Sequence, residues 1–262
     1  MGAARKAVAS LTSLEGKTCL VVGATGDLGR GGALGLATCG AKLFVAGRDA
    51  GRCEAVAAAA RRLGATAHHR VVDVTDRDSV AQLFEAVAQS FGGLDVLVYS
   101  AGANARKPAQ DLRQDEWATV IDANLTGAFY CSQEAFRLME PRRWGRIVFI
   151  SSAAGLVARA TPTTSAYGTS KAGLIHLTRY LAAEWAPYGI TVNSLAPGYF
   201  RTELTRPLWT DESKMAKVLE LTPMARMGEM WEFIGPLVFL ASDASSFVTG
   251  HTLSVDGGRA AL

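Results

Sequence analysis

TCLVVGATGDLG, residues 18–29, is the stretch that decides the fold of this 262-residue chain. Its first five residues are apolar or β-branched and predict a buried strand, and the glycines after them predict a tight turn into a helix. Backbone without side chains can approach a pyrophosphate closely, and a helix N-terminus offers N–H groups and a favourable dipole. Strand, glycine-rich turn and helix together predict a dinucleotide site. The turn residues expected to contact the ligand are Gly23, Thr25, Gly26, Asp27, Leu28 and Gly29.

Six further apolar, β-branched runs predict six more strands, at residues 42–46, 67–74, 94–100, 145–151, 190–196 and 251–255. Their near-continuous apolarity suits parallel strands that are covered on both faces. The intervals carry helical patterns long enough for right-handed crossovers, at residues 28–39, 50–63, 76–91, 114–139, 164–186 and 228–241. The sequence therefore predicts an α/β fold: a doubly wound, seven-stranded parallel sheet, Rossmann-like, flanked by helices.

The domain organisation follows from the absence of any Pro/Gly/Ser-rich linker or break in composition. We expect one domain over residues 14–262, preceded by a flexible arm at residues 1–13. The longest interruption of the pattern lies at about residues 199–227. Long insertions at the carboxyl ends of strands usually carry function, so this segment is predicted to be a substrate lid.

Composition and charge argue against several kinds of partner. The 27 Lys and Arg residues are interspersed with 24 Asp and Glu residues, so no basic patch indicates nucleic acid or an anionic membrane surface. No run of about 20 apolar residues predicts a membrane-spanning helix, and the first residues lack the apolar core of a secretory signal. The cysteines form no CxxC pair, which predicts neither a metal site nor disulfides. We expect a cytoplasmic protein that acts on a small molecule.

The end of the second predicted strand bears on the choice of dinucleotide. It reads AGRD and places Arg48 where an acidic residue would bond the ribose 2′-hydroxyl of NAD(H) and an arginine would pair with the 2′-phosphate of NADP(H). Arg48 therefore favours NADP(H). A solvent-exposed arginine is the alternative, and the adjacent Asp49 keeps NAD(H) open. Asp73 and Val74, after the third strand, are candidate adenine contacts, with a cap or turn carboxylate as the alternative for Asp73.

YGTSK, residues 167–171, contains the candidate acid/base. Tyr167 and Lys171 stand four residues apart in a helical pattern, so their side chains share one helix face. A neighbouring ammonium favours the phenolate, which brings a phenol with an ordinary pKa of about 10 toward working pH. Tyr–Lys pairs at this spacing also occur on helix surfaces, so the pair alone does not establish catalysis.

Two more polar residues accompany this pair. RIVFISSAAG, residues 146–155, ends a predicted strand with Ser152 at the ligand-binding edge of the sheet, where it could polarise a substrate oxygen or cap a turn. Asn124 lies in a helical stretch, where a buried amide could hold a water for proton relay or bridge backbone groups. The conjunction of Asn124, Ser152, Tyr167 and Lys171 indicates an oxidoreductase.

The order of these motifs resembles the single-domain short-chain dehydrogenase/reductase family across residues 13–258. The resemblance implies that Ser152 orients the substrate oxygen, that Tyr167 donates or accepts the proton, and that Asn124 holds a relay water. Lys171 would bind the nicotinamide ribose and lower the pKa of Tyr167. Further cofactor contacts implied by matching positions are Ala101, Gly102, Pro197, Gly198 and Thr202. The C-terminal stretch at residues 247–258 implies a homotetramer, with a homodimer as the alternative.

Three departures from the family pattern concern the cofactor site. The family usually reads TGxxxGxG, whereas Val22 replaces the threonine here and Asp27 replaces the middle glycine. A carboxylate that faced the pyrophosphate would repel it, so Asp27 either points away or weakens cofactor affinity. The usual Asn-Asn-Ala-Gly reads Tyr99-Ser100-Ala101-Gly102, without the two amides expected to stabilise the strand and contact adenosine.

The substrate is indicated by similarity within the family. Residues 103–129, 196–205 and 222–242 most resemble dehydrogenases of the gluconate 5-dehydrogenase type, which implies oxidation of a secondary hydroxyl on a sugar acid or polyol. A 3-oxoacyl carrier-protein reductase is the alternative, and it would need a basic docking patch near the lid, formed by Arg201, Arg206, Lys214 and Lys217. A third hypothesis, a non-catalytic NADP(H)-binding protein, is motivated by Asp27 and the Tyr99-Ser100 pair.

Overall fold

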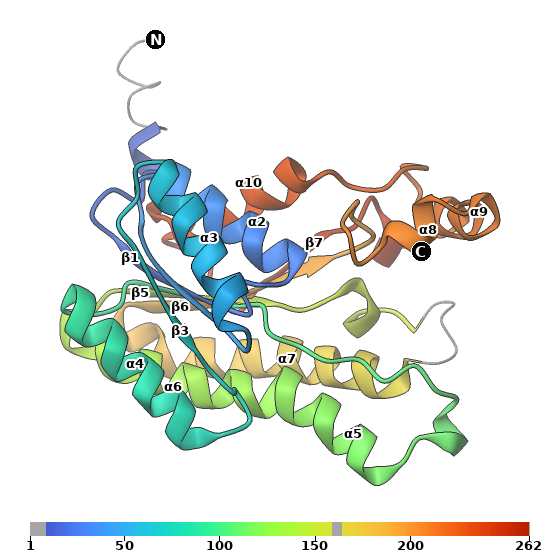
Figure 1. The fold of residues 1–262 in the computed structure, drawn as a ribbon, viewed down its shortest axis with the longest axis horizontal. Coiled ribbons are helices and arrows are strands. Elements are labelled where there is room, and N and C mark those ends of the chain that lie inside the picture. Colours follow the sequence, from blue (N-terminus) through green and yellow to red (C-terminus); the bar gives the residue numbers. More distant parts are fainter. Residues whose placement is uncertain (1–8, 159–163, 262) are drawn as a thin grey trace.

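A seven-stranded parallel sheet forms the centre of the computed structural model, which describes residues 9–158 and 164–261 (Figure 1). The strands are β1 (Thr18–Val22), β2 (Lys42–Gly47), β3 (Ala67–Val71), β4 (Val96–Tyr99), β5 (Gly145–Ile150), β6 (Ile190–Pro197) and β7 (Thr252–Val255). Their order across the sheet is β3-β2-β1-β4-β5-β6-β7, and each neighbouring pair is parallel. The predicted α/β fold is confirmed.

Helices cover both faces of this sheet (Figure 1). One face carries α2 (Asp27–Thr38), α3 (Ala50–Arg62) and α10 (Met230–Ala241). The other carries α4 (Arg77–Phe91), α5 (Gln114–Ile121), α6 (Gly127–Met139) and α7 (Ser165–Trp185). Two short helices, α8 (Arg206–Trp209) and α9 (Glu212–Glu220), lie outside the layers. No helix in the described ranges is long and apolar enough to cross a membrane.

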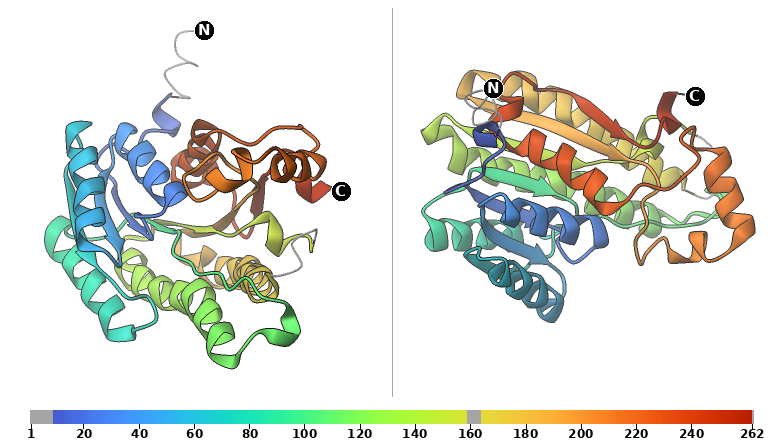
Figure 2. Two further views of the ribbon diagram at one scale, coloured as in Figure 1. Left: turned by 45° about the vertical axis from the view of Figure 1, so that its right-hand side comes forward. Right: turned by 90° about the horizontal axis from the view of Figure 1, so that it is seen from above.

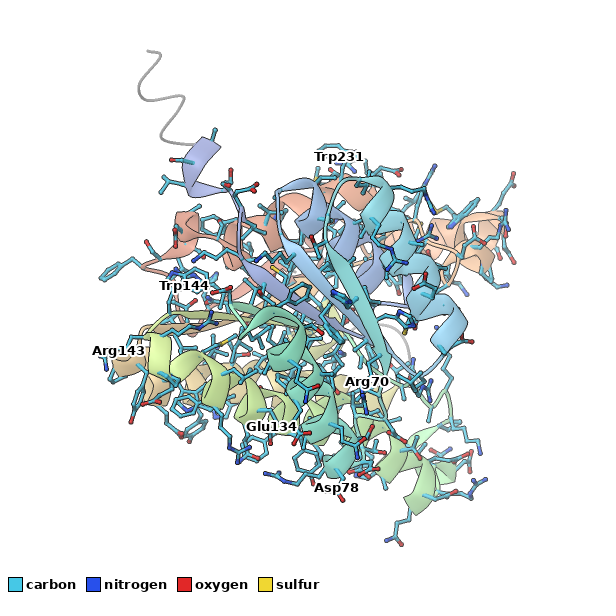
Figure 3. The ribbon with its side chains drawn as sticks, turned by 60° about the vertical axis from the view of Figure 1, so that its left-hand side comes forward. Arg70, Asp78, Glu134, Arg143, Trp144 and Trp231 are labelled. Atoms are coloured by element: carbon cyan, nitrogen blue, oxygen red, sulfur yellow. The ribbon has the colours of Figure 1, made fainter. Side chains whose placement is uncertain are left out.

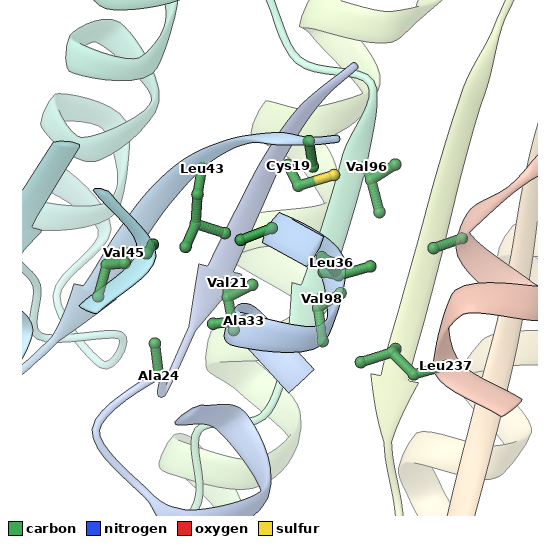
Figure 4. Packing of buried hydrophobic residues seen from close by; sticks show 14 of the residues in the cluster. Cys19, Val21, Ala24, Ala33, Leu36, Leu43, Val45, Val96, Val98 and Leu237 are labelled. Carbon is green, nitrogen blue, oxygen red and sulfur yellow. The ribbon is translucent and has the colours of Figure 1, made fainter. Parts of the chain in front are cut away.

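The core is divided by the sheet into two apolar clusters. Val21 and Val45 point to one face and pack with Leu36 of α2 and Leu237 of α10 (Figure 4). Leu20, one residue before Val21, points to the opposite face and belongs to the second cluster. Successive strand residues alternate between faces, so apolar residues at every position supply both clusters. Full burial of each such side chain contributes about 1.5–3 kcal/mol to stability.

The outer strand β3 differs from the predicted continuous apolar run. It ends at Val71, three residues earlier than its sequence pattern indicated, and most of its residues are partly or fully exposed. Arg70 lies on this edge and donates a hydrogen bond to Gln82 of α4 at 3.0 Å (Figure 3). A charged, short edge strand discourages pairing with other chains. In the predicted arm, residues 1–8 lie outside the described residues, and residues 9–11 are helical.

A π-turn interrupts the helix predicted over residues 114–139. It spans Asp122–Thr126 and separates α5 from α6. The periodicity of the apolar residues gave no sign of it, because one extra residue in a helical turn leaves the composition of the segment unchanged. The consequence is local: Asn124, in the middle of the turn, is completely buried.

The segment after β6 leaves the sheet and is closed on itself by an isolated bridge. Phe200 and Gly228 form an isolated parallel bridge, with Arg201 N–H donating to the Gly228 carbonyl at 2.9 Å and Gly228 N–H donating to the Tyr199 carbonyl at 2.9 Å. We call this bridge the neck. Between its two sides run α8 and α9, which lie at one end of the molecule beside the C-terminus (Figure 2). The residues of the predicted lid thus form a separate excursion.

Candidate active site

A cavity of about 640 Å³ opens where the strand order reverses between β1 and β4. The carboxyl ends of parallel strands diverge at such a point and leave a crevice for a ligand. Predicted cofactor residues in its wall are Gly23, Thr25, Gly26, Arg48, Asp73, Val74, Ala101 and Gly102. Eight of the predicted residues therefore lie on one surface. Asp27, Leu28, Gly29, Pro197, Gly198, Thr202, Tyr167 and Lys171 do not line it.

The glycine-rich turn owes its shape to close backbone contacts. Gly23 has φ +80°, and a Cβ at this position would lie 2.3 Å from the Ala101 nitrogen. A Cβ on Gly29 would lie 2.3 Å from the Gly23 carbonyl oxygen. Only glycine permits both contacts, so Gly29 acts by packing α2 against the turn. Gly26 precedes α2 and provides no side-chain cap, which leaves the first turn of the helix open toward an anion.

Asp27 contacts the segment predicted to be a lid. Its carboxylate accepts a hydrogen bond from the Leu204 N–H at 2.9 Å, across 177 positions of sequence. The sequence left two possibilities, a carboxylate that points away from the pyrophosphate site or one that weakens binding there. The contact with Leu204 and the absence of Asp27 from the cavity wall agree with the first.

Two guanidinium groups line the outer end of the cavity. Arg48 follows β2, and Arg52 lies in the first turn of α3, where its Nη2 donates to the Thr25 carbonyl at 2.6 Å. The intervening Asp49 caps α3 by accepting the Arg52 N–H at 2.9 Å. Its carboxylate is thus engaged by the helix. This end of the site suits a phosphate better than a hydroxyl donor.

Asp73 lines the cavity and also forms a turn. Its Oδ1 accepts hydrogen bonds from the Thr75 N–H at 2.9 Å and the Thr75 hydroxyl at 2.7 Å. These bonds favour the charged form and hold the pKa of Asp73 below its ordinary value. Asp73 therefore has the turn role that the sequence left open, and it also lines the cavity.

Tyr167 and Ser152 are neighbours, and neither lines the cavity. The short turn at Ala153–Gly155 packs against the backbone of α7, where a Cβ on Gly155 would lie 2.7 Å from the Lys171 carbonyl carbon. This contact brings Ser152 beside Tyr167. The surrounding protein raises the pKa of Tyr167 by desolvation, and a hydrogen bond with Ser152 acts in the opposite direction. Ser152 also accepts the Ala154 N–H at 3.1 Å, so its cap role is real as well.

Lys171 is buried, and its ammonium lies near the Tyr167 ring. Its Nζ donates to the Ile150 carbonyl at 2.8 Å and is 5.7 Å from the ring centroid. Burial disfavours the charge and lowers the pKa of Lys171 from 10.5 to about 8. The predicted lowering of the pKa of Tyr167 is not seen, because desolvation of the phenol is the dominant effect. A Cβ on Gly102 would lie 3.8 Å from Lys171 Nζ, so the ammonium reaches the cavity wall.

Asn124 joins several parts of the site. Its side chain accepts the Ala103 N–H at 2.6 Å and donates to the Ala103 carbonyl at 3.0 Å. It also donates to the Ser170 hydroxyl at 2.8 Å, and Ser170 donates to the Tyr167 carbonyl at 2.7 Å. The structure therefore shows the backbone-bridging alternative for the Asn124 side chain.

The predicted nicotinamide-binding stretch lies at the end of β6. Gly198 N–H donates to the Val255 carbonyl at 2.9 Å, and a Cβ on Gly198 would lie 2.7 Å from the Asp256 Cα. Thr202 takes part in a turn of the lid, with its hydroxyl 3.2 Å from the Thr205 hydroxyl. These contacts fix the backbone between β6 and the lid, and the cofactor roles of Pro197, Gly198 and Thr202 stay predictions.

Three site residues were missed by the sequence reasoning. Arg52 stands four positions after Arg48, a spacing that could have indicated a second cation on the same side. Ser170 lies inside the YGTSK motif, so its place next to Tyr167 was available from the helical period. Tyr99 appeared only as a departure from a pattern, and its buried hydroxyl donates to the Ala123 carbonyl at 2.6 Å.

Comparisons with known proteins show what this chain is similar to. A family model described as Enoyl-(Acyl carrier protein) reductase matches residues 23–260. A gluconate 5-dehydrogenase from Gluconobacter oxydans is 37% identical over 248 residues, which cover 95% of this chain and 96% of that protein. A 3-oxoacyl-(acyl-carrier-protein) reductase from Aquifex aeolicus is 37% identical over 246 residues, which cover 94% of this chain and 98% of that protein.

A solved structure matches the fold closely. It is the crystal structure of a gluconate 5-dehydrogenase from Burkholderia cenocepacia in complex with NADP and tartrate. The TM-score is 0.92 at 36% sequence identity, and the match covers 97% of this chain and 99% of that chain. The similarity thus extends over almost the whole chain in both sequence and structure.

Proposed function

Because the chain belongs to the short-chain dehydrogenase/reductase family, we propose that it is an NADP(H)-dependent oxidoreductase acting on a secondary alcohol or ketone of a sugar acid or polyol. The observation that carries the proposal is the cluster of Tyr167, Ser152 and Lys171, whose ammonium reaches Gly102 in the cavity wall. A binding module has no need of an acid/base next to a buried lysine beside its ligand site. This argues against the non-catalytic alternative.

The residues of the cluster take complementary roles in the proposed reaction. The Ser152 hydroxyl holds the substrate oxygen, and Tyr167 gives that oxygen a proton during reduction or removes it during oxidation. NADP(H), when bound, supplies or accepts the hydride. The raised pKa of Tyr167 keeps the phenol protonated, which suits reduction, whereas the charge on Lys171 favours loss of the proton in the oxidative direction. A relay water at Asn124 remains a prediction.

The shape and charge of the cavity fit NADP(H). Gly23 allows backbone to reach a pyrophosphate, and Arg48 and Arg52 supply donors for a 2′-phosphate. Asp49, the one feature that kept NAD(H) open, is occupied as a helix cap. The Burkholderia relative, whose structure contains NADP, supports the same choice.

A sugar acid is the proposed substrate, and a 3-oxoacyl carrier-protein is the competing one. Relatives with either activity are 37% identical to the chain, so similarity alone does not separate them. The basic residues of the predicted docking patch favour the sugar acid, because Arg201 pairs with Glu229, Arg206 with Glu203, and Lys214 with Asp211. These carboxylates neutralise most of the basic surface that an acidic carrier protein would need.

The proposal is tested by measuring turnover of the natural chain and of a variant that lacks only the Tyr167 hydroxyl. Purified protein is mixed with NADPH or NADH and a panel of keto-gluconates, polyols and β-ketoesters, and absorbance of the reduced cofactor is followed. Tyr167→Phe should lower kcat by about 100-fold or more while leaving NADPH affinity within about threefold, because only proton transfer is lost. Unchanged turnover would exclude Tyr167 as the acid/base. Bound NADPH without turnover on any substrate would favour the binding module.

A homotetramer is proposed from the family resemblance. The outermost strand β7 leaves one edge of the sheet without a neighbouring strand in the described chain, and Phe247 beside it is fully exposed. Light scattering after size exclusion should give four times the chain mass. A mass of one chain at micromolar concentration would contradict the assembly.

A further inference from the structure

We propose that Tyr99 is a positioning residue of the proton-transfer site, because its hydroxyl holds the π-turn that carries Asn124. The inference rests on the proposed function and concerns the same site. Tyr99 is the last residue of β4, it is completely buried, and it stands where the family pattern has an asparagine. It does not line the cavity, so its action on the reaction passes through other residues.

The contact is a hydrogen bond from Tyr99 to the Ala123 carbonyl at 2.6 Å. Ala123 belongs to the π-turn, where the backbone departs from the regular α-helical hydrogen-bond pattern, and the Tyr99 hydroxyl supplies its carbonyl with a donor. Burial raises the pKa of Tyr99 well above its ordinary value, and the hydroxyl therefore stays a donor. A Cβ on Gly127 would lie 2.7 Å from this hydroxyl oxygen, so a glycine there leaves the phenol its space.

The π-turn is coupled to the reacting groups by the residue after Ala123. The Asn124 side chain forms two hydrogen bonds with the backbone of Ala103, in the cavity wall. It also donates to the Ser170 hydroxyl, which donates in turn to the Tyr167 carbonyl. The hydrogen bonds of Tyr99 and Asn124 thus tie the π-turn to the end of β4 and to the residues that follow it. Movement of that turn would displace the cavity wall and the start of α7 together.

Tyr99→Phe tests this role by removing one hydroxyl and keeping the ring. We expect kcat for ketone reduction to fall by about tenfold or more, since small displacements of reacting groups cost rate. The NADPH dissociation constant, measured by fluorescence titration, should change by less than about twofold. The alkaline limb of the kcat profile should also shift, because a loosened turn admits water near Tyr167 and Lys171 and relieves the desolvation that displaces both pKa values.

Ser132→Ala is the matched control. The Ser132 hydroxyl is also buried and donates to a helix carbonyl, that of Ala128, at 2.7 Å, but it lies outside the π-turn. It should keep the kcat and pH profile of the natural chain. Wild-type kinetics in Tyr99→Phe, an equal loss in Ser132→Ala, or a joint loss of NADPH binding and kcat would each overturn the positioning role. No turnover by the natural chain would instead refute the proposed function.

Discussion

Arg48 and Arg52 make the choice of cofactor depend on two side chains. Each guanidinium lines the same end of the cavity, so Arg48→Ala and Arg52→Ala should each weaken NADPH by about 1–2 kcal/mol, about tenfold, through loss of a charge-assisted hydrogen bond. NADH lacks the phosphate and should bind as before. Dissociation constants for both cofactors, by fluorescence titration, check this.

Arg62→Ala provides the control for these two variants. Arg62 is exposed in the last turn of α3, away from the cavity wall, and its removal should leave both affinities unchanged. An equal loss of NADPH and NADH affinity in Arg48→Ala would mean that this arginine does not read the 2′-phosphate.

The candidate catalytic residues were easier to predict than the residues that position them. The closeness of Tyr167 and Lys171 follows from their four-residue spacing, and the place of Ser152 follows from the end of a strand, whereas their catalytic roles are implied by the family resemblance. The direction of the pKa of Tyr167 did not follow, because it depends on how much protein surrounds the phenol. Tyr99 could not be assigned either, since its partner is a backbone carbonyl 24 positions away.

At the scale of elements, the contact between α2 and the lid is open to direct test. Asp27→Ala removes both the charge and the acceptor for the Leu204 N–H, whereas Asp27→Asn removes the charge and keeps an acceptor. We expect the Leu204 amide to exchange with deuterium about fivefold faster in Asp27→Ala, which corresponds to about 1 kcal/mol for one exposed hydrogen bond.

The asparagine variant separates the two effects of Asp27. If it exchanges as slowly as the natural chain, the hydrogen bond itself tethers the lid. If both variants exchange as the natural chain does, Asp27 contributes nothing to lid closure. Tighter NADPH binding in both would show that the carboxylate repels the pyrophosphate despite its contact with Leu204.

The strands were predictable because a strand that is buried on both faces needs apolar residues at consecutive positions. β1 has its predicted bounds, Thr18–Val22, and the other strands were located to within a few residues. The ends were less certain: β3 stops early because Asp73 bonds Thr75 and turns the chain. The π-turn left no pattern, because it depends on a contact between β4 and the helix that follows it.

For the whole molecule, Lys171 couples activity to stability. Its pKa is about 8 in the folded chain and 10.5 when unfolded, so the unfolded chain binds more protons between these values and stability rises as pH increases through that window. From pH 7.5 to 9.5 this gain is about 2 kcal/mol. Lys171→Met should lack it and should also lose turnover.

Urea unfolding of both proteins at these two pH values measures the effect. The free energy of unfolding of Lys171→Met relative to the natural chain should be most favourable at pH 7.5 and should decline toward pH 9.5. Parallel pH profiles for the two proteins would show that this lysine is not desolvated in solution.

The neck fixes the two ends of the predicted lid, which bears on how far the sequence between them can change. Its two sides are joined by backbone hydrogen bonds, and the Phe200 ring lies against Gly228 and contacts Phe233 of the core. Both ends of the excursion are therefore fixed whatever lies between them, and doubling its length costs about 0.6 kcal/mol in closure entropy. If the predicted lid selects the substrate, its sequence can change while the sheet and the residues that it positions stay the same.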